Sequence, residues 1–152
     1  MNNKIIIGPN KDFESIKKID ANGVEYWLAR ELMPLLGYVE WRKFEGVIDK
    51  AKDACRASDQ NIEDHFVGAA KMIKLAKGTA KEAVRRIDDY KLSRYGCYLI
   101  AQNGDPRKPE IAMAQTYFAV QTRKQEIFQQ TENDEKRLYS GIILNYPHFY
   151  IK

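Results

Sequence analysis

Apolar positions recur along the chain at two different spacings. Apolar residues three and four positions apart are typical of one buried helix face, whereas alternation is typical of a strand. Helical spacing predicts helices near residues 29–36, 41–57, 93–103 and 109–130. Strand-like runs flank Asp20-Ala21-Asn22-Gly23, whose Asn-Gly pair suits a tight turn. We therefore predict a mostly helical α+β domain, with an N-terminal β-hairpin and a small antiparallel sheet packed on a helical core.

Capping and helix-breaking residues mark the boundaries of the two C-terminal helices. Ser93 can accept a backbone N–H as an N-cap, and Pro109 suits the first turn of the next helix. Gly104 is expected to take the left-handed conformation that closes the helix between them. The helical spacing predicts that seven residues are largely buried: Trp41, Phe44, Ile48, Tyr98, Leu99, Tyr117 and Phe118.

The helices at 29–36 and 41–57, joined through Gly37, have a helix-turn-helix outline. Two packed helices with a short glycine turn are common in any α-rich domain, so the outline alone is weak support for DNA reading. The exposed face of the second helix mixes both signs of charge, which is typical of a solvated face. Its charged residues are Arg42, Lys43, Lys50 and Lys52, with Glu45, Asp49 and Asp53.

The segment between the two helical halves is expected to be helical over residues 65–77. Gly78 then ends that helix, and residues 79–82 have the spacing of a capping box for a new one. The run at 85–92 is compatible with a short strand that returns to the opening hairpin.

Length and composition favour one cytoplasmic domain. The 152 residues are 44% hydrophobic and include 17 aromatic residues, enough to bury a core. No apolar run approaches the ~20 residues of a membrane span, and the start lacks a signal-peptide pattern, so we expect no membrane partner. We place the domain at residues 1–138 and an unusually apolar tail at 139–152. Cys55 and Cys97 are isolated, and we expect both to be reduced, inert core residues.

The excess positive charge is confined to one segment. The chain has a net charge of +4, yet residues 68–94 alone carry 8 Lys and Arg against 3 Asp and Glu. Such a cluster can face phosphates and release counterions. The nucleic-acid-binding candidates are Lys71, Lys74, Lys77, Lys81, Arg85, Arg86, Lys91 and Arg94.

Three arrangements of this basic segment are open. On one continuous helix, Lys71, Lys74, Lys77, Lys81 and Arg85 would share an arc of ~120°. Because Gly78 interrupts the helix, a flexible basic loop or wing is an equal alternative, and a merely solubilising face is the third. Arg94 and Arg123 can instead bond acceptors inside the domain. Tyr90 and Tyr95 are the better candidates for base stacking, although most tyrosines here are expected in the core.

Signatures of enzymes and cofactor sites are missing from the sequence. His65 and His148 lie far apart, and no zinc-protease, esterase, P-loop or dinucleotide motif occurs. Asp88 and Asp89 are adjacent, so their side chains should diverge on a strand. Glu63-Asp64-His65 lacks a second spaced ligand, and His65 is better read as a capping or core residue. We predict a non-enzyme with no catalytic residue, metal or cofactor.

Specific motifs resemble those of a known family. They are Ala29-Arg30-Glu31-Leu32, Leu36-Gly37-Tyr38, Trp41, Phe44, the run from Leu92 to Pro109, and Gln115 to Arg123. From about Phe13 to Tyr139 the chain resembles the bacterial DNA-damage-inducible protein D family, whose amino-terminal part is similar to the Bro domain of viral and phage antirepressors. This resemblance implies a non-enzymatic, nucleic-acid-associated role in a damage response. The apolar end departs from the charged helical sequence that the family would continue with.

Two functional hypotheses follow. The first is a regulator in the DNA-damage (SOS) response that binds DNA, single- or double-stranded, through the basic segment. The second is a protein-interaction module that modulates a DNA-bound partner, such as a repressor or a recombinase filament, without touching DNA itself. A nuclease is disfavoured, because clustered acids and histidines are missing. The sequence leaves the oligomeric state open.

Overall fold

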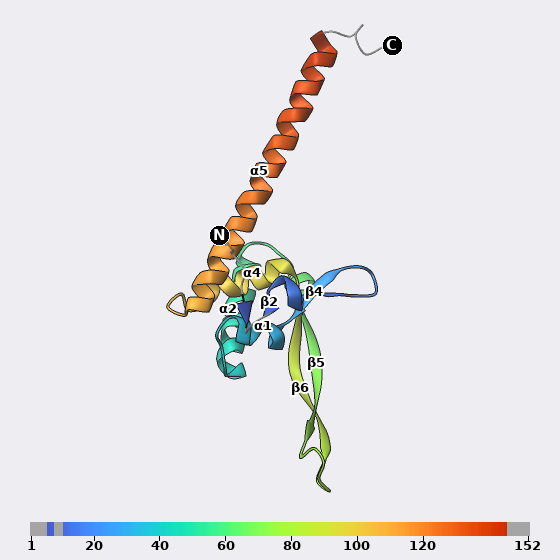
Figure 1. The fold of residues 1–152 in the computed structure, drawn as a ribbon, viewed down its shortest axis with the longest axis vertical. Helices are drawn as coiled ribbons and strands as arrows, with labels where there is room; N and C mark the ends of the chain where they lie inside the picture. The colour runs from blue at the N-terminus through green and yellow to red at the C-terminus, as the bar shows by residue number, and fades with distance from the viewer. Residues whose placement is uncertain (1–5, 8–10, 146–152) are drawn as a thin grey trace. The chain divides into compact units, whose positions relative to one another are not determined.

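A computed structural model describes residues 6–7 and 11–145, and the chain divides into two compact units, residues 1–117 and 118–152. The first unit is a helical α+β domain, as predicted (Figure 1). Its elements begin with β1 (Ile6–Ile7), β2 (Lys11–Asp12), the 3-10 helix η1 (Glu14–Ile16), β3 (Lys18–Ile19), β4 (Glu25–Leu28), α1 (Ala29–Leu35) and α2 (Trp41–Ala57). They continue with α3 (Ile62–His65), β5 (Phe66–Leu75), β6 (Ala83–Leu92), α4 (Arg94–Asn103) and the first part of α5 (Pro109–Asn145).

The main sheet is antiparallel, with the strand order β3-β4-β6-β5. Its opening hairpin, β3 and β4, turns through Gly23, whose φ of 80° is the left-handed conformation that the turn needs. β6 then pairs with β4 through Trp27 opposite Leu92. The predicted strand that returns to the opening hairpin is therefore confirmed.

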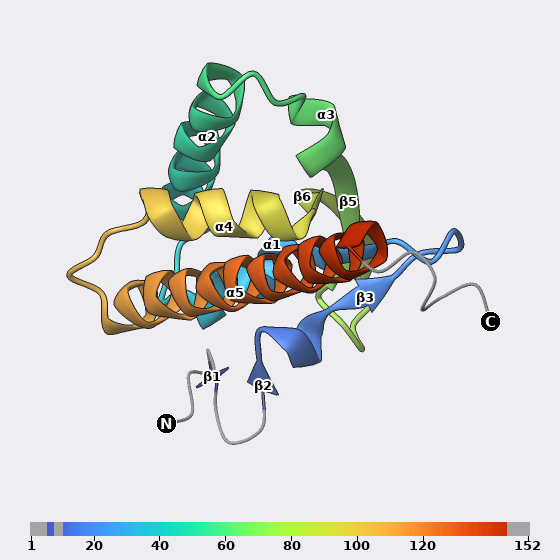
Figure 2. The same cartoon turned by 90° about the horizontal axis from the view of Figure 1, so that it is seen from above.

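The core lies where β4 and β6 meet the helices, and α2 packs chiefly on α4 (Figure 2). Trp27 is fully buried, its ring stacks on Phe13 with centroids 4.4 Å apart, and its Nε1 donates to the Phe13 carbonyl oxygen at 2.8 Å. The predicted burial is confirmed, with Phe44, Ile48, Leu99, Tyr117 and Phe118 buried and Trp41 and Tyr98 half-buried.

The ends of α4 follow one prediction and contradict another. Ser93 caps the helix, since its Oγ accepts from the Gly96 amide at 3.0 Å. The left-handed conformation expected at Gly104 is wrong, because its φ is −76°. Gly104 is needed for close packing instead: a Cβ there would lie 2.3 Å from Cδ1 of the buried Ile111.

Replacing Gly96 by alanine should destabilise the domain. The added Cβ would lie 2.7 Å from the His65 carbonyl oxygen, which is held in place by accepting the Ser93 amide at 3.1 Å. Overpacking of this kind costs about 1–3 kcal/mol of the free energy of unfolding. Gly46→Ala is the matched control: nothing lies within 4 Å of its added Cβ, and a mid-helix alanine should stabilise α2 by about 0.5–1 kcal/mol. Urea denaturation of both variants checks the pair, and equal effects would contradict the packing argument.

Both cysteines should react slowly in the folded protein. Cys55 and Cys97 are free thiols, 0% and 1% exposed, and burial raises the pKa of each. A thiol that stays protonated and inaccessible is a poor nucleophile. Titration with a thiol reagent should give no rapid phase until denaturant is added. Rapid modification of either residue in the native protein would contradict this expectation.

The second unit contains the remainder of α5, which continues without a break through Leu138 to Asn145. α5 is therefore longer than the predicted helix at 109–130, and the expected domain boundary at residue 138 falls within it. Its exposed apolar residues include Ile127, Phe128, Leu138 and Tyr139. Residues 146–152 of the expected tail, including His148, lie outside the described residues. Among the described helices, none has both the length and the apolar character that a membrane span requires.

Candidate nucleic-acid interface

The basic segment forms a two-stranded antiparallel ribbon, which we call the arm (residues 66–92). β5 and β6 pair along their whole length, from Phe66 opposite Leu92 to Leu75 opposite Ala83. Figure 1 shows β5 and β6 extending away from the helices of the first unit. The inner end of the arm is the one at Phe66 and Leu92, where Leu92 also pairs with Trp27 of β4. Only that end is buried, because side chains from residue 70 to residue 86 are exposed with the exception of the half-buried Ile73.

The helices predicted over 65–77 and from residue 79 are wrong, and the alternative of a basic wing is confirmed. Lysines at positions 71, 74 and 77 have the spacing of a helix face. The segment is nevertheless a strand, because β5 pairs with β6, which follows Gly78 in the sequence. Gly78 and Ala76 both have positive φ values, 80° and 53°, in the turn that joins the strands. Two similar apolar-basic runs on either side of Lys77-Gly78-Thr79 were the signal for a hairpin.

Seven of the eight predicted binding residues lie on the arm with exposed side chains. Lys77 and Lys81 are in the turn, and the other five are on the strands: Lys71, Lys74, Arg85, Arg86 and Lys91. The arm carries these seven basic residues against three acidic ones, a formal charge of +4. One of the acids, Asp89, is 4% exposed and faces the domain. The solvent-facing charge of the arm is therefore strongly positive.

The single basic stripe, which was the open alternative for one continuous helix, is not formed, because β5 and β6 are paired strands. Lys91 lies at the inner end of the arm with its Nζ 5.0 Å from the centroid of the Tyr26 ring. Lys74 forms an exposed ion pair with Glu82 at 3.6 Å, and Glu82 also accepts the Gly78 amide at 3.1 Å. Exposed ion pairs contribute little to stability, so Lys74 remains available to another anion.

Asp89 fixes the inner end of the arm to α1. Its Oδ1 accepts from the Arg30 amide at 3.0 Å and from the Tyr90 amide at 2.8 Å. The first contact caps the N-terminus of α1, where a carboxylate is favoured by the helix dipole. Asp88 is exposed, so the predicted divergence of the two carboxylates is confirmed.

A column of cations and rings fixes the arm to α2 as well. The Arg30 guanidinium lies 4.0 Å from the centroid of the Trp41 ring, which stacks on Tyr90 at 6.3 Å. Lys52 lies 4.4 Å from the centroid of the Tyr90 ring. All four residues are half-buried. Tyr90 is therefore occupied by neighbours and is no open platform for a base. Tyr95 likewise packs against His65 and Tyr98, at 4.7 and 6.3 Å.

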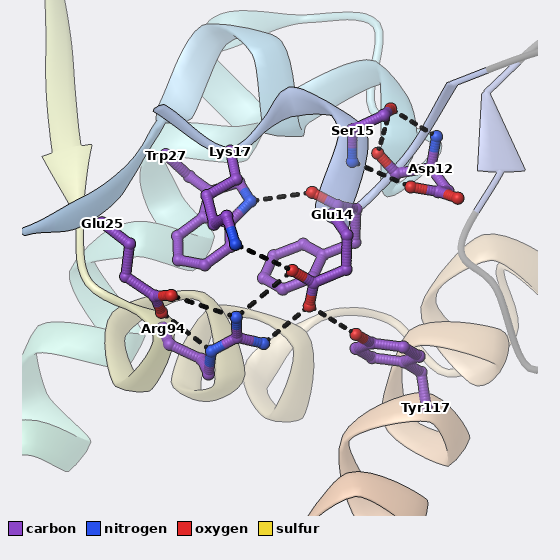
Figure 3. Close-up of polar contacts among 9 residues, drawn as sticks. Asp12, Glu14, Ser15, Lys17, Glu25, Trp27, Arg94 and Tyr117 are labelled. Carbon is purple, nitrogen blue, oxygen red and sulfur yellow. Dashed lines mark hydrogen bonds and ion pairs between the residues drawn. The ribbon is translucent and has the colours of Figure 1, made fainter. Parts of the chain in front are cut away.

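Arg94 differs from the other seven candidates, because it is bonded inside the domain (Figure 3). Its Nη1 donates to Glu14 Oε1 at 2.7 Å, and its Nε donates to Glu25 Oε2 at 2.9 Å. Its guanidinium also lies 5.0 Å from the Trp27 ring. The alternative reading of Arg94 as an internal hydrogen-bond donor is confirmed, and we leave it out of the proposed interface.

The Glu14 carboxylate connects Arg94 to α5. Tyr117 donates its hydroxyl to Glu14 Oε1 at 2.7 Å. The hydrogen bond from Arg94 lowers the pKa of Glu14 and, in return, raises that of Arg94. Burial, together with the bond to Glu14, raises the pKa of Tyr117 to about 12. The network thus holds η1, α4 and the beginning of α5 together.

The Tyr117 hydroxyl should make stability depend on alkaline pH. A pKa raised on folding, from 10 to about 12, stabilises the native state below pH 10, and this contribution is lost as the pH rises through 12. Tyr117→Phe should therefore be less stable than the parent at neutral pH by about 1 kcal/mol, and this difference should shrink between pH 10 and 12. A parent-to-variant difference that stays constant with pH would contradict the assignment.

The helix-turn-helix outline is present, with α1 and α2 joined through Gly37, whose φ is 78°. The exposed face of α2 carries charges of both signs, as its sequence suggests. Arg56 pairs with Asp53 at 2.7 Å, and Lys43 pairs with Glu40 at 3.6 Å. This face is therefore a weaker candidate for binding a polyanion than the arm. In the part of the chain that is described, no cluster of three His, Cys, Asp or Glu side chains could hold a metal ion.

Comparison with known proteins agrees with the resemblance seen in the sequence. Over 135 residues, the chain is 50% identical to the DNA damage-inducible protein D of Escherichia coli (strain K12). These aligned residues make up 86% of this chain. The chain spans about half (48%) of the length of that relative. No solved structure gives a significant match. The BRO family, N-terminal domain, matches residues 15–137, a stretch that includes the whole arm. Because this match takes in most of the chain, the protein belongs to the BRO N-terminal domain family.

Proposed function

We propose that this protein is a non-enzymatic regulator in the DNA-damage response that binds DNA through the phosphates, using the arm. One observation carries the proposal: seven basic side chains gather on an exposed ribbon whose inner end is fixed to the domain. The role in the damage response is inferred from the 50% identical relative, which is named as a damage-inducible protein. The non-enzymatic role follows from the resemblance to the Bro domain of antirepressors.

Electrostatics favours a polyanion as the ligand of the arm. Each lysine or arginine that neutralises a phosphate releases condensed counterions, and this release supplies most of the sequence-independent affinity for DNA. The seven side chains are exposed, so binding need not break a buried interaction. Phosphate contacts carry no base information, and the arm should therefore bind many sequences with similar affinity.

A salt series tests the proposal directly. The logarithm of the affinity of the purified chain for a labelled DNA should fall linearly with the logarithm of the salt concentration, with a slope of ~0.9 per phosphate contact on a duplex. A protein that uses most of the arm should show a slope of at least about 4. Weak binding with a shallow slope would exclude the arm as an electrostatic DNA-binding element.

The protein-interaction hypothesis is the second candidate, and the apolar side chains of the arm favour it. Val67, Met72 and Val84 are 47%, 61% and 60% exposed. Met72 and Val84 are diagonal neighbours on one face of the arm, and adjoining exposed apolar side chains can mark the docking site of a partner protein. On this reading a repressor or a recombinase filament would bind the arm. The salt series separates the two candidates, because such a module shows little affinity for DNA alone.

A further inference from the structure

The register of the arm divides its basic residues between two faces. Directly opposed residues of an antiparallel pair share a face, and successive residues alternate between faces. Ile73 is opposite Arg85, so Arg85 lies on the same face as Lys71, two residues before Ile73. Met72 is opposite Arg86, so Arg86 shares the other face with Lys74. In the outer part of the arm, each face therefore has one basic side chain from each strand; Lys91, opposite Val67 at the inner end, lies on the face of Lys71 and Arg85.

The two basic pairs lie at the same level of the arm. All four side chains, Lys71 and Arg85 on one face and Lys74 and Arg86 on the other, fall within four consecutive cross-strand pairs. All four are exposed. A single flat surface of phosphates could meet only one of these pairs. Anionic groups on both sides of the ribbon are needed to engage both pairs at once.

We propose that the arm stands on edge in the major groove of duplex DNA, with each face turned toward the phosphates of one strand. This inference rests on the proposed function and names its ligand as duplex DNA. A duplex groove is the nucleic-acid surface that has a phosphate chain on each side. A single strand has one backbone, so it would leave one basic pair without a phosphate.

The dimensions of a ribbon select the major groove. A two-stranded β-ribbon is among the elements that the major groove of B-DNA admits. The major groove of B-DNA is ~12 Å wide, whereas the minor groove is only ~6 Å wide. Met72 and Val84 are the cross-strand partners of Arg86 and Lys74, so they lie on the same face as this basic pair. Lys77 and Lys81 in the turn can reach phosphates farther along the groove.

Two matched double variants test this arrangement. Lys71→Ala with Arg85→Ala removes the basic pair of one face, and Lys74→Ala with Arg86→Ala removes that of the other. Each removes one charge from each strand of the arm, and circular dichroism verifies that both variants fold. Salt slopes are measured on one duplex and on one of its single strands. On the duplex, each variant should lower the slope by about 1.8, and the combined variant by about 3.6.

The parent should bind the duplex more tightly than the single strand, and netropsin, a minor-groove ligand, should not displace it. A duplex slope that responds to only one pair would overturn the two-faced arrangement, as would equal affinity for the single strand. Displacement by netropsin would overturn the choice of groove. These failures leave the proposed function standing, because they still require DNA binding by the arm. A steep parent slope that neither variant changes, or no DNA affinity at all, would instead overturn both proposals.

Discussion

Replacing Lys74, Lys77, Lys81 and Arg85 together by alanine should lower the log-log salt slope of DNA binding by about 3 to 4 units. The estimate assigns one phosphate to each side chain, at ~0.9 per contact on duplex DNA and ~0.7 on a single strand. Between ~50 and ~200 mM salt, the parent's affinity should then fall on the order of 100-fold more than the variant's. Fluorescence anisotropy with a labelled oligonucleotide measures both slopes. The loss should be similar for different DNA sequences.

A second quadruple variant controls for the overall change in charge. The exposed side of α2 has four basic residues that can be replaced by alanine: Arg42, Lys43, Lys50 and Arg56. Their replacement removes as many positive charges as the arm variant does, but from the helix-turn-helix outline. This variant should keep most of the parent's slope, because acidic residues such as Glu40 and Asp53, the partners of Lys43 and Arg56, offset the positive charge of this face toward a polyanion. If it lost the slope and the arm variant kept it, α2 would be the DNA-binding element. If the arm variant bound as tightly as the parent with an unchanged slope, the arm would be a solvated surface and the protein-interaction hypothesis would take first place.

Trp27→Ala should cause the largest loss of stability among single substitutions, about 3–5 kcal/mol of the free energy of unfolding. Trp27 is fully buried, stacks on Phe13 and receives the Arg94 guanidinium on its ring. Its removal leaves a cavity beside β4, and the Phe13 carbonyl loses the hydrogen bond that it accepts from Nε1. Guanidinium denaturation, monitored by far-ultraviolet circular dichroism, measures the loss.

Two further variants help to interpret this loss. The first separates the effect of the cavity from that of the lost hydrogen bond, and the second is a control at an exposed position. Trp27→Phe keeps a ring next to Phe13 but removes the donor, so it should cost less than the alanine variant. Val39→Ala, at a side chain that is 90% exposed, should change stability by less than about 0.5 kcal/mol. A Trp27→Ala loss below about 1 kcal/mol would mean that the region around Phe13 and Trp27 is not part of the cooperative core.

Local sequence signals predicted most of the helical structure. The helices expected near residues 41–57 and 93–103 are α2 and α4 almost to the residue. Their apolar residues recur at helical spacing, and Ser93 supplies a cap that acts within one turn. The hairpin at Gly23 was predictable for the same reason, since a turn is decided by four neighbouring residues. Such signals act between residues that are close in the sequence, so they do not depend on the rest of the fold.

The first strand of the arm was predicted wrongly as a helix, because the signal for this strand is not local. Lys71, Lys74 and Lys77 have helical spacing, and the one glycine and two alanines of residues 68–70 have weak preference for strands. What decides the strand is the partner, since Lys71 pairs across the arm with Ile87, sixteen residues later. Pairing at this distance depends on the turn at Gly78 and on the attachment of β6 to β4. Tertiary context therefore overrode the helical spacing.

The sequence by itself determined the family, most of the helices and the segment that carries the positive charge. The tertiary structure decided which of these charges face solvent and on which face they lie. It placed Arg94 against Glu14, 80 residues away, and turned Asp89 inward to cap α1. Through the strand register, it also placed Lys71 and Arg85 on one face of the arm and Lys74 and Arg86 on the other. The physical reason is that charge is a property of each residue, whereas ion pairing and strand register depend on which distant segments the fold brings together.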